Sequence, residues 1–130
     1  MADKPRYRVR VNYKARQDIS AIVTWTWNAF GELATVRYEA LIAQALIDIA
    51  SDPDRIGSQS LPDILVAGAR IYHLSFSRSR APRPSVKEPR HFILYRKCSN
   101  GEIEVARILH DRRDFDRHLP DDYRTSDTTD

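Results

Sequence analysis

The chain has 130 residues, a formal net charge of +3 and one cysteine. A chain of this length fits one domain that can bury its own core, and the single cysteine excludes an intrachain disulfide. With 42% hydrophobic and 30% charged residues, the composition is that of a folded protein and not of a disordered one.

The distribution of apolar and charged residues narrows the class further. Residues 1–6 contain no apolar stretch, and the longest nearly uncharged apolar run, Leu41 to Ile47, is far shorter than the ~20 residues of a membrane span. We therefore expect a cytoplasmic protein without a membrane segment. Residues 70–117 hold twelve Lys and Arg against six Asp and Glu. Such a basic region attracts nucleic acid or an acidic partner, although a solvated surface has the same composition.

The N-terminal half predicts one strand and two helices. Residues 6–13 alternate between apolar and polar side chains, as in a strand with one buried face. Residues 15–30 carry apolar side chains every three to four positions, which predicts an amphipathic helix that stops at Gly31. Residues 32–51 predict a second helix that ends before Pro53. We expect these helices to form an antiparallel hairpin packed on a sheet.

The second predicted helix carries two apolar stripes. We expect one to face the sheet, and it consists of Val36, Ala40, Ala43, Ile47 and Ala50, with Leu33 one turn before them. The other would be exposed and bind a partner, because a small monomer rarely leaves a large apolar patch in water. It consists of Tyr38, Leu41 or Ile42, Ala45 and Ile49. The alternative is that both stripes are buried. Trp25 and Trp27 point to different sides of the first helix, so one of them is a further candidate for this interface.

Three strands are predicted in the second half, at residues 69–76, 91–97 and 103–110, after a connection over 53–68. Asn-Gly at positions 100 and 101 predicts a two-residue turn between the last two strands, because both residues tolerate positive φ. This turn would set Lys97 opposite Glu104 and Ile93 opposite Ile108.

Residues 77–89 mix prolines with basic residues, which predicts a flexible, positively charged loop inserted between two strands. The complete order of strand, helix, helix and three strands predicts a small single α+β domain, with the helical hairpin packed on an antiparallel-rich sheet. We expect this domain to occupy residues 1–120, with a helical turn at 115–119. The acidic residues 121–130 are expected to form a disordered tail.

The stretch EVARILHDRRD at residues 104–114 resembles the end of the last strand in ParE and RelE toxins, where a hydrophobic–Arg–hydrophobic–Leu–His segment precedes a charged Arg-Asp pair. Gly68-Ala69-Arg70 looks like the family's Gly-x-Arg entry into its second strand. Residues 91–96 resemble its third strand, which often closes on Tyr-Arg. The resemblance covers residues 6–117 and departs at 77–89, where the family usually has a short turn. It implies a RelE/ParE-like fold.

The resemblance also implies a toxin of a type II toxin–antitoxin pair, neutralised by a cognate, ParD-like antitoxin that covers a groove along the helical hairpin. The antitoxin-binding candidates are Tyr38, Ile42, Ala45 and Ile49. Fold alone does not fix the target, because RelE-like members cleave mRNA on the ribosome and ParE-like members inhibit DNA gyrase.

The closing pattern Leu-His-x-x-Arg-Asp is more similar to ParE. Our hypothesis is therefore binding, without a cofactor, of a basic face to the gyrase–DNA complex, whose cleaved state it would stabilise. The target-binding candidates are Arg70, Arg96, Arg107, His110, Arg112 and Arg113. A plain solvated charge run over residues 112–114 is the alternative for that segment.

A ribosome-dependent mRNA endonuclease of the RelE type is the main alternative function. It would need a base, an acid and a cation at the reacting phosphate. His91, Tyr95 and His110 would share one side of the sheet, with Arg107 as a cation. Strand-end histidines and core tyrosines commonly serve structure instead. We predict no metal site, because no further ligand lies at a useful spacing. A non-toxic nucleic-acid-binding relative is the third class, with steep salt dependence.

Overall fold

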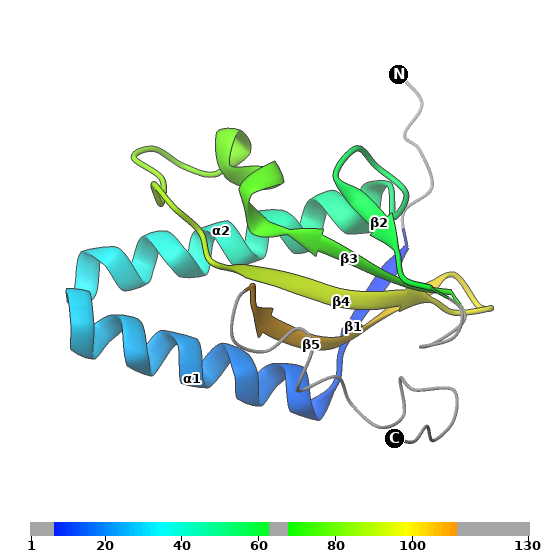
Figure 1. The fold of residues 1–130 in the computed structure, drawn as a ribbon, viewed down its shortest axis with the longest axis horizontal. Coiled ribbons are helices and arrows are strands. Elements are labelled where there is room, and N and C mark those ends of the chain that lie inside the picture. The colour runs from blue at the N-terminus through cyan, green and yellow to red at the C-terminus, as the bar shows by residue number, and fades with distance from the viewer. Residues whose placement is uncertain (1–6, 63–67, 112–130) are drawn as a thin grey trace.

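The computed structural model describes residues 7–62 and 68–111, which form a helical hairpin and a sheet. The elements are β1 (Arg8–Val11), α1 (Tyr13–Phe30), α2 (Glu32–Ser51), β2 (Ser58–Ser60), β3 (Ala69–His73), the 3-10 helix η1 (Leu74–Arg80), β4 (His91–Lys97) and β5 (Glu102–His110). The sheet has five strands in the order β1-β5-β4-β3-β2. β1 is parallel to β5, and the other neighbours are antiparallel. Both helices lie on one face of the sheet (Figure 1), which confirms the predicted α+β class.

Local capping determines where the helices of the hairpin begin and end. The side chain of Asn12 accepts a hydrogen bond of 3.0 Å from the backbone N–H of Ala15, so α1 starts at Tyr13, two residues before the predicted start. Gly31 ends α1 with a φ of 90° and donates its N–H to the carbonyl of Trp27. Only glycine adopts this φ without strain, and the chain reverses there into α2, whose bounds are those predicted.

α2 packs on the sheet with the side opposite to the one predicted. The buried side chains of this helix include Leu41, Ile42, Ala45 and Ile49. Leu33, Val36 and Ile47, which were predicted to face the sheet, are 61%, 53% and 52% exposed. The prediction is wrong because both stripes have helical spacing, and periodicity does not rank them. The buried stripe holds the bulkier side chains, so its burial removes more apolar area from water.

In the β4–β5 hairpin, the pairing next to the turn is shifted by one residue from the predicted register, and a bulge further along the strands reverses this shift. Cys98 N–H donates to the carbonyl of Glu102 at 2.7 Å, and Gly101 has a φ of 77°, so the turn is longer than the predicted two-residue turn. Lys97 therefore pairs with Ile103 and not with Glu104. A bulge at Leu94/Tyr95 restores the predicted pairing of Ile93 with Ile108. It also explains why Val105 and Ile108, three positions apart, both contact the core under the helices.

The region between α2 and β4 is more ordered than predicted. Residues 58–60 form β2, which pairs with β3 although the sequence there was interpreted as connection. β3 ends at His73, and the rest of the predicted strand over 69–76 belongs to η1. Ser77 is fully buried and Ala81 nearly so. The first part of the predicted flexible loop is therefore packed against α2.

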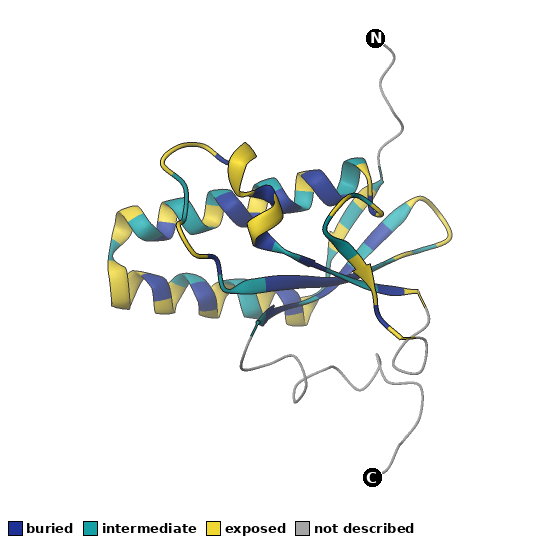
Figure 2. Cartoon of the chain, turned by 45° about the horizontal axis from the view of Figure 1, so that its top comes forward, coloured by how far each residue is buried: buried dark blue, intermediate teal, exposed yellow. Residues whose placement is uncertain are grey.

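Apolar side chains fill both faces of the sheet. The cluster under the helices includes Ile42, Ile49, Ile93, Tyr95 and Val105. Strand alternation places a second cluster, which includes Phe92, Leu94, Ala106 and Leu109, on the opposite face. Figure 2 shows the buried bands of α1 and α2 interrupted by exposed residues along both helices. The predicted helical turn at 115–119 and the tail at 121–130 lie outside the described residues.

Candidate functional site

A groove of about 1110 Å³ lies between the helical hairpin, the ends of β4 and β5, and the segment 84–90. Its apolar walls include Ile22, Trp25, Phe30, Val86 and Ile108. Trp25 and Phe30 meet edge to face with their ring centroids 5.5 Å apart. The groove therefore offers a preformed apolar surface of the kind that binds a side chain or a helix.

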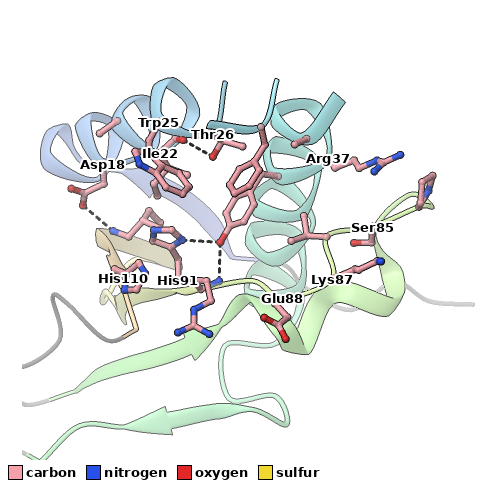
Figure 3. Close-up of a pocket in the computed structure, with 18 residues that line it drawn as sticks. Asp18, Ile22, Trp25, Thr26, Arg37, Ser85, Lys87, Glu88, His91 and His110 are labelled. Carbon is pink, nitrogen blue, oxygen red and sulfur yellow. Dashed lines mark hydrogen bonds between the residues drawn. The ribbon is translucent and has the colours of Figure 1, made fainter. Parts of the chain in front are cut away.

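A chain of polar side chains lines one side of this groove (Figure 3). The Tyr38 hydroxyl accepts a hydrogen bond of 3.0 Å from the backbone N–H of Arg90 and lies 2.7 Å from Nδ1 of His91. The ring of His91 meets that of His110 edge to face, with centroids 5.2 Å apart. Burial raises the pKa of Tyr38 to about 12. The hydroxyl is therefore neutral at physiological pH and has a proton to donate to His91.

An ion pair joins α1 to β5 beside the groove. Asp18 accepts hydrogen bonds from Nε and Nη2 of Arg107 at 2.7 and 3.0 Å, and another of 2.9 Å from the backbone N–H of Ile108. The two hydrogen bonds from its guanidinium hold Arg107 against the carboxylate, and the third ties the same carboxylate to the backbone of β5. The contact fixes the angle at which α1 crosses the end of the sheet.

Asp111 directly follows β5, and positive and titratable side chains lie around its carboxylate. It accepts a hydrogen bond of 2.9 Å at Oδ2 from Nε2 of His73. Its Oδ1 lies 3.6 Å from Nε of Arg90 and 3.7 Å from Nδ1 of His110. In the described part of the chain, no three His, Cys, Asp or Glu side chains are grouped so that they could hold a metal ion.

The segment that closes the groove is anchored to α2 through a buried carboxylate. Asp48 accepts hydrogen bonds from Ser77 at 2.6 Å, from Gln44 at 3.0 Å and from Nε of Arg80 at 3.1 Å. Ser77 in turn lies 2.8 Å from the hydroxyl of Tyr72. Burial by itself would raise the pKa of Asp48, but these hydrogen bonds outweigh it and hold the pKa below its usual value. The network fixes η1, from which the chain continues into the wall of the groove.

The residues of the nuclease hypothesis are separated by the structure. His91 and His110 are paired across the strands, as predicted. Tyr95 is fully buried, and its hydroxyl donates to the carbonyl of Pro53 and lies 2.6 Å from Ser58. Burial raises the pKa of Tyr95. Arg107 is engaged by Asp18. Two of the four side chains therefore lie together in the groove.

The arginines of the proposed gyrase-binding face do not share one surface among the described residues. Arg70 lies on the helix side of β3 and contacts Ser58, Ser60 and Asp54. Arg96 lies on the opposite face of the sheet and donates to Glu104 at 3.0 Å. Arg107 binds Asp18 and His110 lines the groove. Arg112 and Arg113 lie outside the described residues.

The antitoxin-binding candidates on α2 are divided in the same way. Tyr38 lines the groove. Ile42, Ala45 and Ile49 lie in the core. They were expected to bind the antitoxin only if the seam from Val36 to Ala50 faced the sheet, and it does not. Of the two tryptophans, Trp25 lines the groove, whereas Trp27 is 53% exposed and is not among the residues that line it.

Several groove residues were not singled out from the sequence. Asp18 lies one turn before Ile22 on the inward side of α1, and a carboxylate on an apolar face is a signal for a buried partner. Phe30, Arg37 and Lys87 carry no comparable signal, because they come together only when the hairpin meets the segment 84–90. No helix in the described ranges 7–62 and 68–111 is long and apolar enough to span a bilayer.

Comparisons with known proteins identify the family. Residues 9–115 match the family model described as the ParE toxin of the type II toxin–antitoxin system parDE. A search of curated proteins found no match to the sequence. Among solved structures, the chromosomal ParDE toxin–antitoxin system from P. aeruginosa is similar in fold, with a TM-score of 0.58 and 15% identity over 82% of this chain and 98% of that chain. The chain therefore belongs to the ParE toxin family of type II toxin–antitoxin systems.

Proposed function

We propose that this chain inhibits DNA gyrase by binding, in the cytoplasm, and that a cognate ParD-like antitoxin neutralises it by laying an amphipathic segment in the groove. The observation that carries the antitoxin part of the proposal is the composition of the groove. Apolar walls are combined with the cations Arg37, Lys87 and Arg90, with Glu88 between the last two. A segment with apolar side chains on one face and carboxylates at its edge complements such a surface.

Two side chains that a nuclease would use are already hydrogen-bonded within the protein, which favours binding over RNA cleavage. The Tyr95 hydroxyl serves the core, and Arg107 is held by two hydrogen bonds from its guanidinium to Asp18. Neither side chain presents its polar end to the groove. Membership of the ParE family supports gyrase as the target, as expected from the closing pattern of the sequence.

The primary test is a supercoiling reaction. Purified, antitoxin-free protein is incubated with gyrase, ATP and relaxed plasmid, and both supercoiled and linear DNA are measured. We expect blocked supercoiling and trapped linear DNA, both relieved by the cognate antitoxin. Normal supercoiling by a preparation that still arrests growth would contradict the proposal.

The residue assignment for the target has its own test. We expect the charge swap Arg112→Glu/Arg113→Glu to abolish inhibition, because both arginines belong to the proposed target-binding set. The matched control is Lys14→Glu/Arg16→Glu, which makes the same change of net charge at two exposed positions of α1. If both double variants inhibit gyrase equally, the assignment is wrong.

The mRNA endonuclease remains a second candidate because of one observation. His91 and His110 face each other in an accessible groove, and Tyr38 lies within hydrogen-bond distance of His91. Two imidazoles in contact could serve as base and acid for the attack of a ribose hydroxyl on phosphate. Cleavage of ribosome-bound mRNA by the wild-type protein, lost in His110→Ala, would favour this function over gyrase binding.

A further inference from the structure

The outward side of α2 carries a regular apolar seam. Its exposed members are Leu33, Val36, Ala43 and Ile47, and Ala40 and Ala50 within the same seam are half-buried. These positions alternate in steps of three and four residues, which is the spacing of a coiled-coil seam. The seam points away from the buried stripe of Leu41, Ala45 and Ile49, and none of its members is charged. A sheet-facing helix of a monomer normally places polar residues on this side.

The residues of the seam are arranged symmetrically about the middle of α2. When a copy of the helix is laid antiparallel on the first, Leu33 meets the partner's Ala50, Val36 meets the partner's Ile47, and Ala40 meets the partner's Ala43. The central layers are then small, which lets the two backbones approach closely. The outermost layers combine Leu33 with Ala50, and the intermediate layers pair the β-branched Val36 and Ile47. A two-fold dimer requires this kind of self-complementary surface.

The side chains along the edges of the seam are compatible with the same arrangement. A two-fold axis sets each edge of the helix against the same edge of the other copy. Arg37 then lies beside the partner's Gln44, and Glu39 beside the partner's Leu46, so like charges do not face each other directly. The antiparallel dipoles of the two helices are also favourably oriented.

We propose that two copies of this chain associate through α2, packed antiparallel along the seam from Leu33 to Ala50. The helix has 20 residues, so the contact extends over about 30 Å. A contact between two helices of this length falls at the small end of specific interfaces, below about 1,200 Å². The dimer is therefore weak and reversible. The apolar walls of the groove lie on the sheet side of the hairpin and stay accessible, and Arg37 is the groove residue that borders the seam. This inference does not depend on the proposed target.

Sedimentation velocity of the purified full chain at increasing concentration tests the association. We expect the sedimentation coefficient to rise from the monomer to the dimer value, and Val36→Glu to weaken the dimer by at least tenfold. Val36 is exposed in the monomer, so this variant keeps its thermal stability. The matched control is Ile56→Glu, at a position 87% exposed and outside α2, which should dimerise as the wild type does. A chain that stays monomeric, or a dimer indifferent to Val36→Glu, overturns the proposal.

Cysteine cross-linking tests the direction of the helices. In a Cys98→Ser background, Ala40→Cys protein is mixed with Ala43→Cys protein under mild oxidation. The antiparallel arrangement predicts that the mixture cross-links faster than either protein alone. Faster cross-linking of each protein with itself would indicate a parallel pair and would overturn the arrangement.

Discussion

Two polar clusters border α2, and they differ in their access to solvent. Around Asp48, three side chains donate to a carboxylate that is 5% exposed. Around His91, polar groups line a groove that is open to a partner and flanked by Trp25 and Phe30. Buried polar groups are stabilising only when they are satisfied. The first cluster therefore serves the fold, and the second is available for recognition.

The largest effect is expected when the Asp48 cluster is broken. Asp48→Ala leaves Arg80, Gln44 and Ser77 without their common acceptor, and we expect the free energy of unfolding to fall by about 3 kcal/mol. Chemical denaturation measures this change. Glu39→Ala, at an exposed position of the same helix, is the control and should change stability by less than about 0.5 kcal/mol. Equal effects of the two substitutions would remove the distinction between the clusters.

A substitution in the wall of the groove should have the opposite effect: it should weaken antitoxin binding and leave the free energy of unfolding unchanged. Trp25→Ala removes the largest apolar side chain of the wall, and we expect the affinity for the antitoxin to fall by about 2 kcal/mol, or roughly 30-fold. Calorimetric titration with the antitoxin measures it. Trp27→Ala is a matched control, because Trp27 is comparably exposed and lies outside the groove. Identical affinities of the two variants would place the antitoxin elsewhere.

Tyr38 both stabilises the fold and lines the groove. We therefore expect its substitution to lower the stability by an amount between those of the two previous cases. Its hydroxyl connects Arg90 to His91, so Tyr38→Phe leaves a backbone N–H and an imidazole nitrogen without this partner. We expect a loss of about 1 kcal/mol in unfolding free energy, measured by denaturation. An unchanged stability would show that water replaces the hydroxyl and that the groove is wetter than the packing of Tyr38 indicates.

The smallest expected effect is a dependence of stability on pH, which appears only at acidic pH. Burial by itself would raise the pKa of Asp48, but hydrogen bonding outweighs this effect and holds the pKa in the folded state below its ordinary value of 3.8. The stabilisation is therefore present above that value and is lost as the pH falls through the lower pKa of the folded state. The difference in unfolding free energy between wild type and Asp48→Asn should shrink below about pH 4. A difference independent of pH would mean that the charge of Asp48 contributes nothing.

Local sequence signals predicted much of the fold, but not the pairing next to the β4–β5 turn or the side of α2 that packs on the sheet. The bounds of α2 and β4 follow from periodicity and from Pro53. The face of α2 does not, because two stripes with helical spacing compete and only the tertiary context selects one. The β4–β5 pairing illustrates another limit. The turn at Gly101 and the bulge at Leu94/Tyr95 offset each other, and neither has an unambiguous sequence signature.

The candidate site was only partly predictable for a related reason. The pairing of His91 with His110 follows from the hairpin, and Tyr38 was singled out as a partner contact. The groove itself depends on Asp18 meeting Arg107 and on Asp48 holding η1, contacts between residues far apart in the sequence. Such contacts carry no local pattern, so the separation of Arg70, Arg96 and Arg107 could not be foreseen either.

We propose that this toxin acts by binding and that its groove performs no catalysis on the target. The gyrase supercoiling reaction with the His91→Ala variant tests this most directly, because His91 is a catalytic candidate and not a target-binding one, with thermal unfolding as the check of its fold. We predict that the folded variant blocks supercoiling and traps linear DNA to the same extent as the wild type. Loss of toxicity in a folded variant, together with cleavage of mRNA by the wild type alone, would contradict the account.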